Sequence, residues 1–84
     1  MSLANQIRQI FLQDWDPVGI KHVPQAQDEY DSYLANITRL VQSQAAKNDI
    51  AAALLRAEVD MGLGTNENRA NLVAAKLLLI YSSQ

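Results

Sequence analysis

The 84-residue chain is long enough for one domain, residues 1–84, and its 49% hydrophobic content argues against disorder. It contains no cysteine and a single histidine, which argues against a disulfide framework, a cysteine nucleophile and a zinc site. The net charge is −2, the N-terminus has no secretion signal, and no segment reaches the roughly 20 apolar residues that span a bilayer, so we expect a cytoplasmic protein without a membrane partner.

The first predicted helix covers residues 2–14. Ser2 is a suitable N-cap, and the helix should end at Asp16, because the residue before a proline is disfavoured in the α region. Residues 15–27 then form a long connection, in which Gly19 permits a turn with positive φ. The apolar residues of this helix follow helical spacing: Leu3, Ile7, Ile10 and Phe11.

The second predicted helix, residues 28–44, has the clearest periodicity in the chain. Asp28 is expected to be its N-cap, and Glu29 and Asp31 place negative charge in the first turn, where the helix dipole favours it. Its apolar residues occupy one arc of the helix: Tyr30, Tyr33, Leu34, Ile37, Leu40 and Val41.

Two further helices are predicted, from about residue 49 to 61 and from about residue 66 to 82. Gly62 should end the first of them as a C-cap glycine. The expected N-caps are Asn48 or Asp49 for the third helix and Thr65 or Asn66 for the fourth. No period-two alternation indicates a strand. We therefore predict an all-α fold, a small four-helix domain with one long loop between helices 1 and 2.

The fourth predicted helix has a second apolar strip, opposite the one that should face the core. This strip consists of Leu72, Ala75 and Leu79. A helix that is apolar on two faces either lies between neighbours or presents one face to a second chain. The strip is therefore a candidate face for a homodimer.

Unusual residues are concentrated between positions 14 and 33, and this stretch is strongly acidic. Between positions 14 and 31 there are five acids and one lysine, which gives this stretch a local charge of −4, whereas the rest of the chain carries +2. No basic stripe is interleaved with aromatic residues, so we expect no nucleic-acid partner. A protein partner steered by this charge would be basic.

The aromatic residues of this stretch admit two interpretations. Trp15, Tyr30 and Tyr33 either fill the space between the loop and the second helix, or serve as anchors of a protein-binding surface. On the second interpretation, acids surround the anchors, and the candidate binding residues are Trp15, Asp16, Glu29, Tyr30, Asp31 and Tyr33.

No pattern in the sequence predicts catalysis, a metal or a cofactor. A calcium loop counted from Asp14 has Val18 at position 5, where an acid is needed, and Gln25 at position 12, where a glutamate is needed. A different metal site, with oxygen ligands from Asp14, Asp16, Asp28 and Asp31, would require the loop to fold back. Helix capping and exposure to solvent explain these acids more simply. His22 lacks an adjacent orienting carboxylate and is expected to be a surface residue. We therefore expect a protein that is not an enzyme.

Glu58 interrupts the apolar strips of the third predicted helix. It should either reach outward to water or pair with Arg56, Arg69 or Lys76; a functional buried acid is the less simple alternative.

Two short runs resemble the signature of the YugE-like family, small bacterial helical proteins without an assigned activity. They are Trp-Asp-Pro-Val-Gly-Ile at 15–20 and Asp-Glu-Tyr-Asp-Ser-Tyr at 28–33. The resemblance implies an all-helical bacterial cytoplasmic domain and no catalytic or ligand-binding residue. Two functional hypotheses follow from the residues themselves. The first is a protein-interaction module that binds through residues 14–33, for example an immunity- or antitoxin-like inhibitor; the alternative is a structural homo-oligomer built through the fourth helix.

Overall fold

The structure is a computed structural model that describes residues 2–17, 19 and 30–83. The described part of the chain forms four α-helices and a π-helical turn and contains no strand. The elements are α1 (Leu3–Ile10), η1 (Phe11–Trp15), α2 (Asp31–Gln42), α3 (Lys47–Asp60) and α4 (Glu67–Ser82). The predicted all-α, four-helix fold is confirmed, with the long connection between η1 and α2. None of the described helices is long and apolar enough to cross a membrane.

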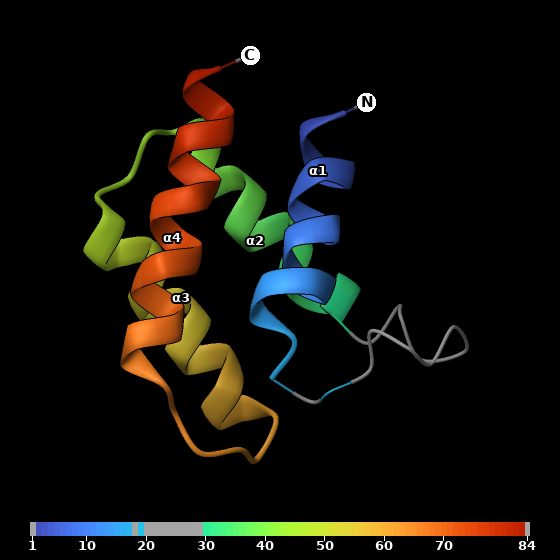
Figure 1. The fold of residues 1–84 in the computed structure, drawn as a ribbon, viewed down its shortest axis with the longest axis vertical. Coiled ribbons are helices and arrows are strands. Elements are labelled where there is room, and N and C mark those ends of the chain that lie inside the picture. The colour runs from blue at the N-terminus through green and yellow to red at the C-terminus, as the bar shows by residue number, and fades with distance from the viewer. Residues whose placement is uncertain (1, 18, 20–29, 84) are drawn as a thin grey trace.

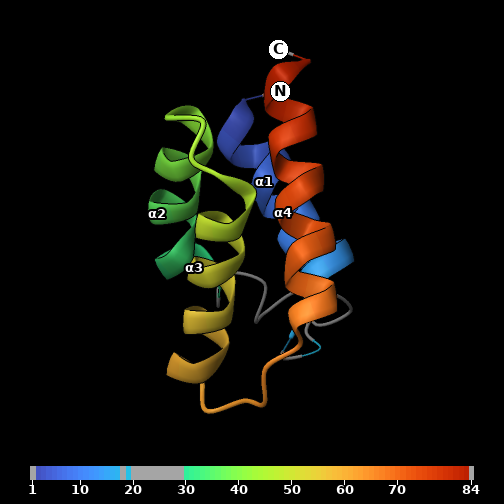
Figure 2. The same ribbon diagram turned by 90° about the vertical axis from the view of Figure 1, so that its left-hand side faces the viewer.

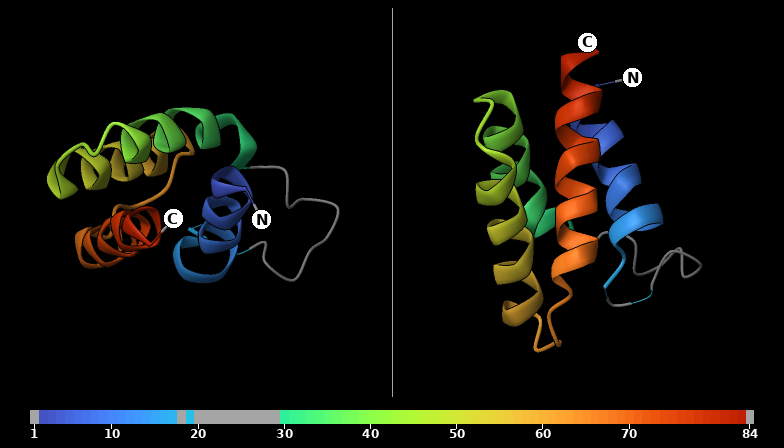
Figure 3. Two further views of the ribbon diagram at one scale, coloured as in Figure 1. Left: turned by 90° about the horizontal axis from the view of Figure 1, so that it is seen from above. Right: turned by 60° about the vertical axis from the view of Figure 1, so that its left-hand side comes forward.

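The helices are arranged in two layers. Viewed from above, α2 and α3 form one layer, and α1 and α4 form the other (Figure 3, left). The layer of α1 and α4 faces the viewer in Figure 1, and the two chain ends lie at the same end of the molecule. Turning the molecule shows α3 running alongside α4 (Figure 2), and these two helices make the most extensive packing in the domain. The molecule measures 30 × 27 × 18 Å.

Side-chain caps define the beginnings of α1 and α4, as predicted. The Ser2 hydroxyl accepts a hydrogen bond from the Asn5 N–H at 3.2 Å, and the Asn66 side chain accepts one from the Arg69 N–H at 3.0 Å. The start of α3 was predicted wrongly. The helix begins after Ala46, which has no capping side chain, so the expected caps fall inside its first turn.

The start of α2 also differs from the prediction. The α-helix begins at Asp31, and Tyr30 occupies the N-cap position without a side-chain hydrogen bond to the helix. Asp31 lies in the first turn, as expected. The predicted cap, Asp28, lies outside the described residues.

Left-handed residues end α2 and α3. Gly62 has a φ of 76° after α3, and the Leu63 N–H reaches back to the Glu58 carbonyl at 3.0 Å. This is the predicted glycine C-cap, in the form of a Schellman motif. Gln44 has the same role after α2, with a φ of 57°, and there a non-glycine residue adopts the left-handed conformation.

One core holds the two layers together. The buried apolar residues come from every element, and most were expected from the helical periodicity. They are Ile7, Ile10, Phe11, Trp15, Tyr30, Ile37, Val41, Ile50, Ala51, Leu54, Ala57, Ala70, Val73, Ala74 and Leu77.

Candidate functional site

Three aromatic rings form the part of the core between η1 and the start of α2. The Phe11 and Trp15 ring centroids lie 5.0 Å apart, and those of Trp15 and Tyr30 lie 5.3 Å apart. Phe11 and Tyr30 meet edge to face at 6.4 Å. These separations are typical of favourable aromatic pairs. All three residues are buried, so the structure supports the interpretation of Trp15 and Tyr30 as packing residues.

The wide turn of η1 ends at a left-handed residue. The Asp16 N–H donates to the Phe11 carbonyl at 2.7 Å, five residues back, and Asp16 has φ 33° and ψ 55°. The helix therefore ends where the sequence predicted, although Asp16 adopts the left-handed rather than the extended conformation. Gly19 has a φ of 80°, as expected for a turn glycine.

A hydrogen bond joins the two halves of the sequence signature. The Tyr30 hydroxyl donates to Asp16 Oδ1 at 2.8 Å, across the long connection. With the ring contact between Trp15 and Tyr30, this bond fixes the end of η1 against the start of α2. These signature residues therefore have a structural explanation that requires no bound partner.

The described acids of this stretch also have partners within the chain. Lys76 Nζ lies 2.8 Å from Asp14 Oδ2, and Arg8 Nε lies 3.1 Å from Asp31 Oδ1. Tyr33 is only partly buried. Glu29, the remaining candidate of this surface, lies outside the described residues. The structure thus brings Trp15, Asp16 and Tyr30 together, but in the core and in an internal hydrogen bond.

Glu58 is a fully buried carboxylate that links α3 to α4. Its Oε1 accepts a hydrogen bond from Arg69 Nη2 at 2.8 Å, and its Oε2 receives a long one from Trp15 Nε1 at 3.4 Å. The pairing with Arg69 is one of the predicted alternatives, and the alternative of an outward-reaching side chain is wrong. Arg69 Nε is itself buried without a hydrogen-bond partner, so the pair is only partly satisfied.

The outer side of α4 exposes large apolar side chains. Leu72 is 73% exposed and Leu79 is 66% exposed, and Ala75 between them is also exposed. We call these three residues the α4 face. The amphipathic pattern predicted that this strip lies away from the α4 core stripe, and the structure leaves it open to solvent. Val59 on α3 is the other large exposed apolar residue in the described part of the chain.

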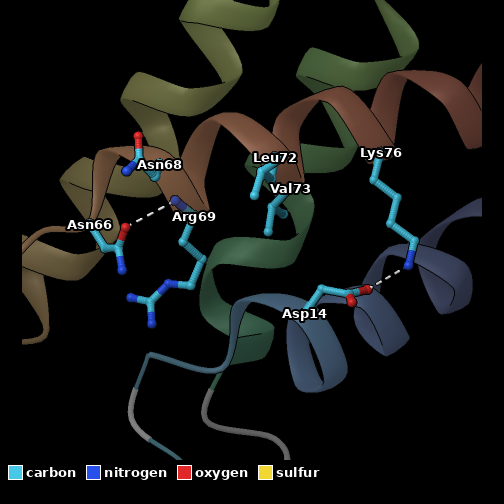
Figure 4. A pocket seen from close by; sticks show the side chains of 7 residues that line it. All are labelled: Asp14, Asn66, Asn68, Arg69, Leu72, Val73 and Lys76. Atoms are coloured by element: carbon cyan, nitrogen blue, oxygen red, sulfur yellow. Dashed lines mark hydrogen bonds and ion pairs between the residues drawn. The ribbon is translucent and has the colours of Figure 1, made fainter.

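Two hollows border the α4 face on the side of α1 and η1. The first, about 390 Å³, lies between the start of α4 and η1 and is lined by Asp14, Asn66, Asn68, Arg69, Leu72, Val73 and Lys76 (Figure 4). The second, about 530 Å³, lies between α1 and the end of α4 and is lined by Gln6, Gln9, Ile10, Lys76, Leu79, Ile80 and Ser83. The ion pair between Lys76 and Asp14 stands between them, and Figure 4 shows the two side chains reaching toward each other.

No pattern in the sequence predicts these hollows. They depend on the separation of α1 from α4 and on an ion pair between residues 62 positions apart. What the sequence does contain is the leucine strip at their edge.

The described residues contain no group of three or more acidic or histidine side chains that could hold a metal ion. The proposed set of aspartates is dispersed: Asp14 pairs with Lys76, Asp31 with Arg8, and Asp16 with Tyr30. Asp28 and His22 lie outside the described residues.

Replacing Tyr30 with phenylalanine tests the hydrogen bond across the long connection. The variant keeps the ring contacts and loses the bond to the Asp16 carboxylate, so we expect a loss of about 1–2 kcal/mol in the free energy of unfolding. Urea denaturation followed by circular dichroism measures it. Tyr33→Phe is the matched control, expected to change stability by less than about 0.5 kcal/mol. Equal effects of the two changes would contradict the structural role of Tyr30.

Comparison of the chain with protein-family models, curated proteins and solved structures gave no match.

Proposed function

We propose that the protein is an interaction module that binds a helix of another polypeptide along the α4 face. The observation that carries this proposal is the pair of exposed leucines on α4, each at the edge of a hollow. Contiguous exposed apolar surface with a polar rim is typical of a binding site rather than of an idle surface.

The spacing of the face favours a helical partner. Leu72, Ala75 and Leu79 follow the i, i+3, i+7 pattern of a helix–helix seam. The two leucines lie seven residues apart, or about 10.5 Å along the axis of α4. Side chains of a helix laid beside them would enter the hollows, where Ile10, Val73 and Ile80 supply apolar contact.

The acidic stretch has less support as the binding surface. Trp15 and Tyr30 are buried, and Asp14, Asp16 and Asp31 have partners within the chain. An immunity- or antitoxin-like role therefore depends in this proposal on the α4 face, not on a basic partner docked at residues 14–33.

Site-specific photo-cross-linking, in cells and with the purified protein at high concentration, tests the proposal. A benzophenone side chain placed at position 72 or 79 should give a discrete protein adduct, because the partner covers both leucines. The same group at Ala35 or Ala52, exposed on α2 and α3, should give none. Adding Ala75→Glu should abolish the adducts, since a charge in the middle of the apolar face would be buried without a partner. Equal adducts at all four positions, or none at 72 and 79, would refute the proposal.

A further inference from the structure

We infer that the helix covering the α4 face is α4 of a second copy of this chain, which runs antiparallel to the first about a two-fold axis between Ala75 and Lys76. This inference rests on the proposed function and names its partner. A two-fold interface must be self-complementary, since the same patch supplies both sides. The α4 face meets this condition in its shape and in its charge.

The shape condition follows from the positions of the leucines. Leu72 and Leu79 lie at equal distances on either side of the axis, so an antiparallel pair brings Leu72 of one copy opposite Leu79 of the other. Each leucine also lies at the edge of a hollow, one toward the start of α4 and one toward its end. A projecting side chain of one copy therefore meets a hollow of the other at both ends of the contact.

The centre of the contact allows a close approach of the two helices. Ala75 is the smallest residue of the face, and helix–helix distances depend on the side chains at the contact. Lys76, its neighbour at the axis, is held toward η1 by its ion pair with Asp14 (Figure 4). Two copies of Lys76 near the axis are thus each neutralised within their own chain, which removes the like-charge repulsion that would oppose the pairing.

The size of the contact determines what kind of dimer to expect. α4 has 16 residues, or about 24 Å of helix, and the contact is one helix wide. Interfaces below about 1,000 Å² are weak or transient. The expected dimer therefore forms reversibly and is populated only at high protein concentration.

The absence of cysteine from the chain permits a sharp test of the geometry. In the antiparallel pair, position 75 lies close to position 75 of the other copy, so Ala75→Cys should form a disulfide-linked dimer under mild oxidation. Position 68 faces position 83 of the other copy. Asn68→Cys and Ser83→Cys should therefore link when the two proteins are mixed. Asn68→Cys alone should not, because its two copies lie about 22 Å apart.

Two controls separate this contact from random collision and from other arrangements. Ala52→Cys, exposed on α3, should oxidise to dimer at least tenfold more slowly than Ala75→Cys. Sedimentation equilibrium of the wild-type protein should show a reversible dimer, and Leu79→Glu should remove it. A parallel pair would instead link Asn68→Cys to itself, which would overturn the inferred arrangement.

The outcomes also distinguish this inference from the proposed function. A wild-type protein that stays monomeric at the highest concentration, with no difference between Ala75→Cys and Ala52→Cys, overturns the second copy as partner. If the photo-adducts at positions 72 and 79 then contain a different protein, the α4 face is still a binding surface. If those positions give no adduct, both the inference and the proposed function fail.

Discussion

Replacing Arg69 with methionine should lower the free energy of unfolding by about 3–5 kcal/mol. The change keeps most of the apolar stem but removes the only charged partner that the fully buried Glu58 carboxylate has among the described residues. Trp15 Nε1, at 3.4 Å, is too distant to replace a hydrogen bond of 2.8 Å. An uncompensated charge would then lie in the core. Urea denaturation followed by circular dichroism measures the loss.

Two further variants separate the buried pair from a general effect of lost charge. Arg56→Met removes an exposed ion pair with Asp60 and should cost at most about 0.5 kcal/mol. The double variant Glu58→Leu with Arg69→Met should regain most of the lost stability, because apolar residues of similar volume often replace a buried pair without loss. If Arg69→Met were no more harmful than Arg56→Met, Glu58 would have to be hydrated in solution.

Replacing Trp15 with alanine should cost about 3–5 kcal/mol. The indole is 1% exposed, packs between Phe11 and Tyr30, and reaches Glu58 on α3, so the change leaves a cavity where η1, the start of α2 and α3 meet. A domain of this size has a total stability on the order of 4–12 kcal/mol, so the variant should lose a large part of it and unfold at a much lower urea concentration than the wild-type protein. Far-ultraviolet circular dichroism during urea denaturation detects this without the tryptophan signal.

The matched control for this prediction is Val59→Ala, a truncation on α3 at a position 56% exposed. The atoms that it deletes are exposed to solvent and do not fill the core, so the change should alter stability by less than about 0.5 kcal/mol. A Trp15→Ala protein that unfolds at the same urea concentration as Val59→Ala would show that the aromatic cluster is not a stabilising contact in solution.

Local signals in the sequence explain why much of the fold was predictable. Ser2, Asn66 and Gly62 act on backbone groups within a few residues of themselves, so their roles follow from the sequence alone. The start of α3 was missed because a local signal of this kind is absent there. Ala46 offers no side-chain cap, and no residue type marks that position.

Long-range contacts could not be predicted in the same way. The pairs Asp14–Lys76 and Arg8–Asp31 join residues far apart in the chain, and the choice of partner depends on how the helices pack. The aromatic residues of the stretch 14–33 present a related difficulty. Helical periodicity shows that a residue belongs to the apolar face of its helix. It does not determine whether that face is buried in the core or exposed at the surface of the domain.

The candidate binding surface was therefore predicted in part. The strip Leu72, Ala75 and Leu79 followed from the periodicity of α4, since its opposite stripe already contains enough apolar residues to fill the core. The hollows beside the strip arise from the spacing between α1 and α4, which no short sequence pattern encodes.

The wide turn of η1 also gives this end of the domain some freedom in the length of its chain. The ring closed by the Asp16 N–H and the Phe11 carbonyl contains one residue more than an α-helical ring. Removing one residue between them, such as the exposed Gln13, would let the same N–H and carbonyl bond in an α-helical turn, so the residues after the turn would keep nearly the same direction relative to α1. Trp15 would then still point toward the core, and Asp16 would still lie within reach of Tyr30. We therefore expect a deletion of Gln13 to be accepted better than a deletion inside one of the α-helices, where every later side chain would turn by about 100°.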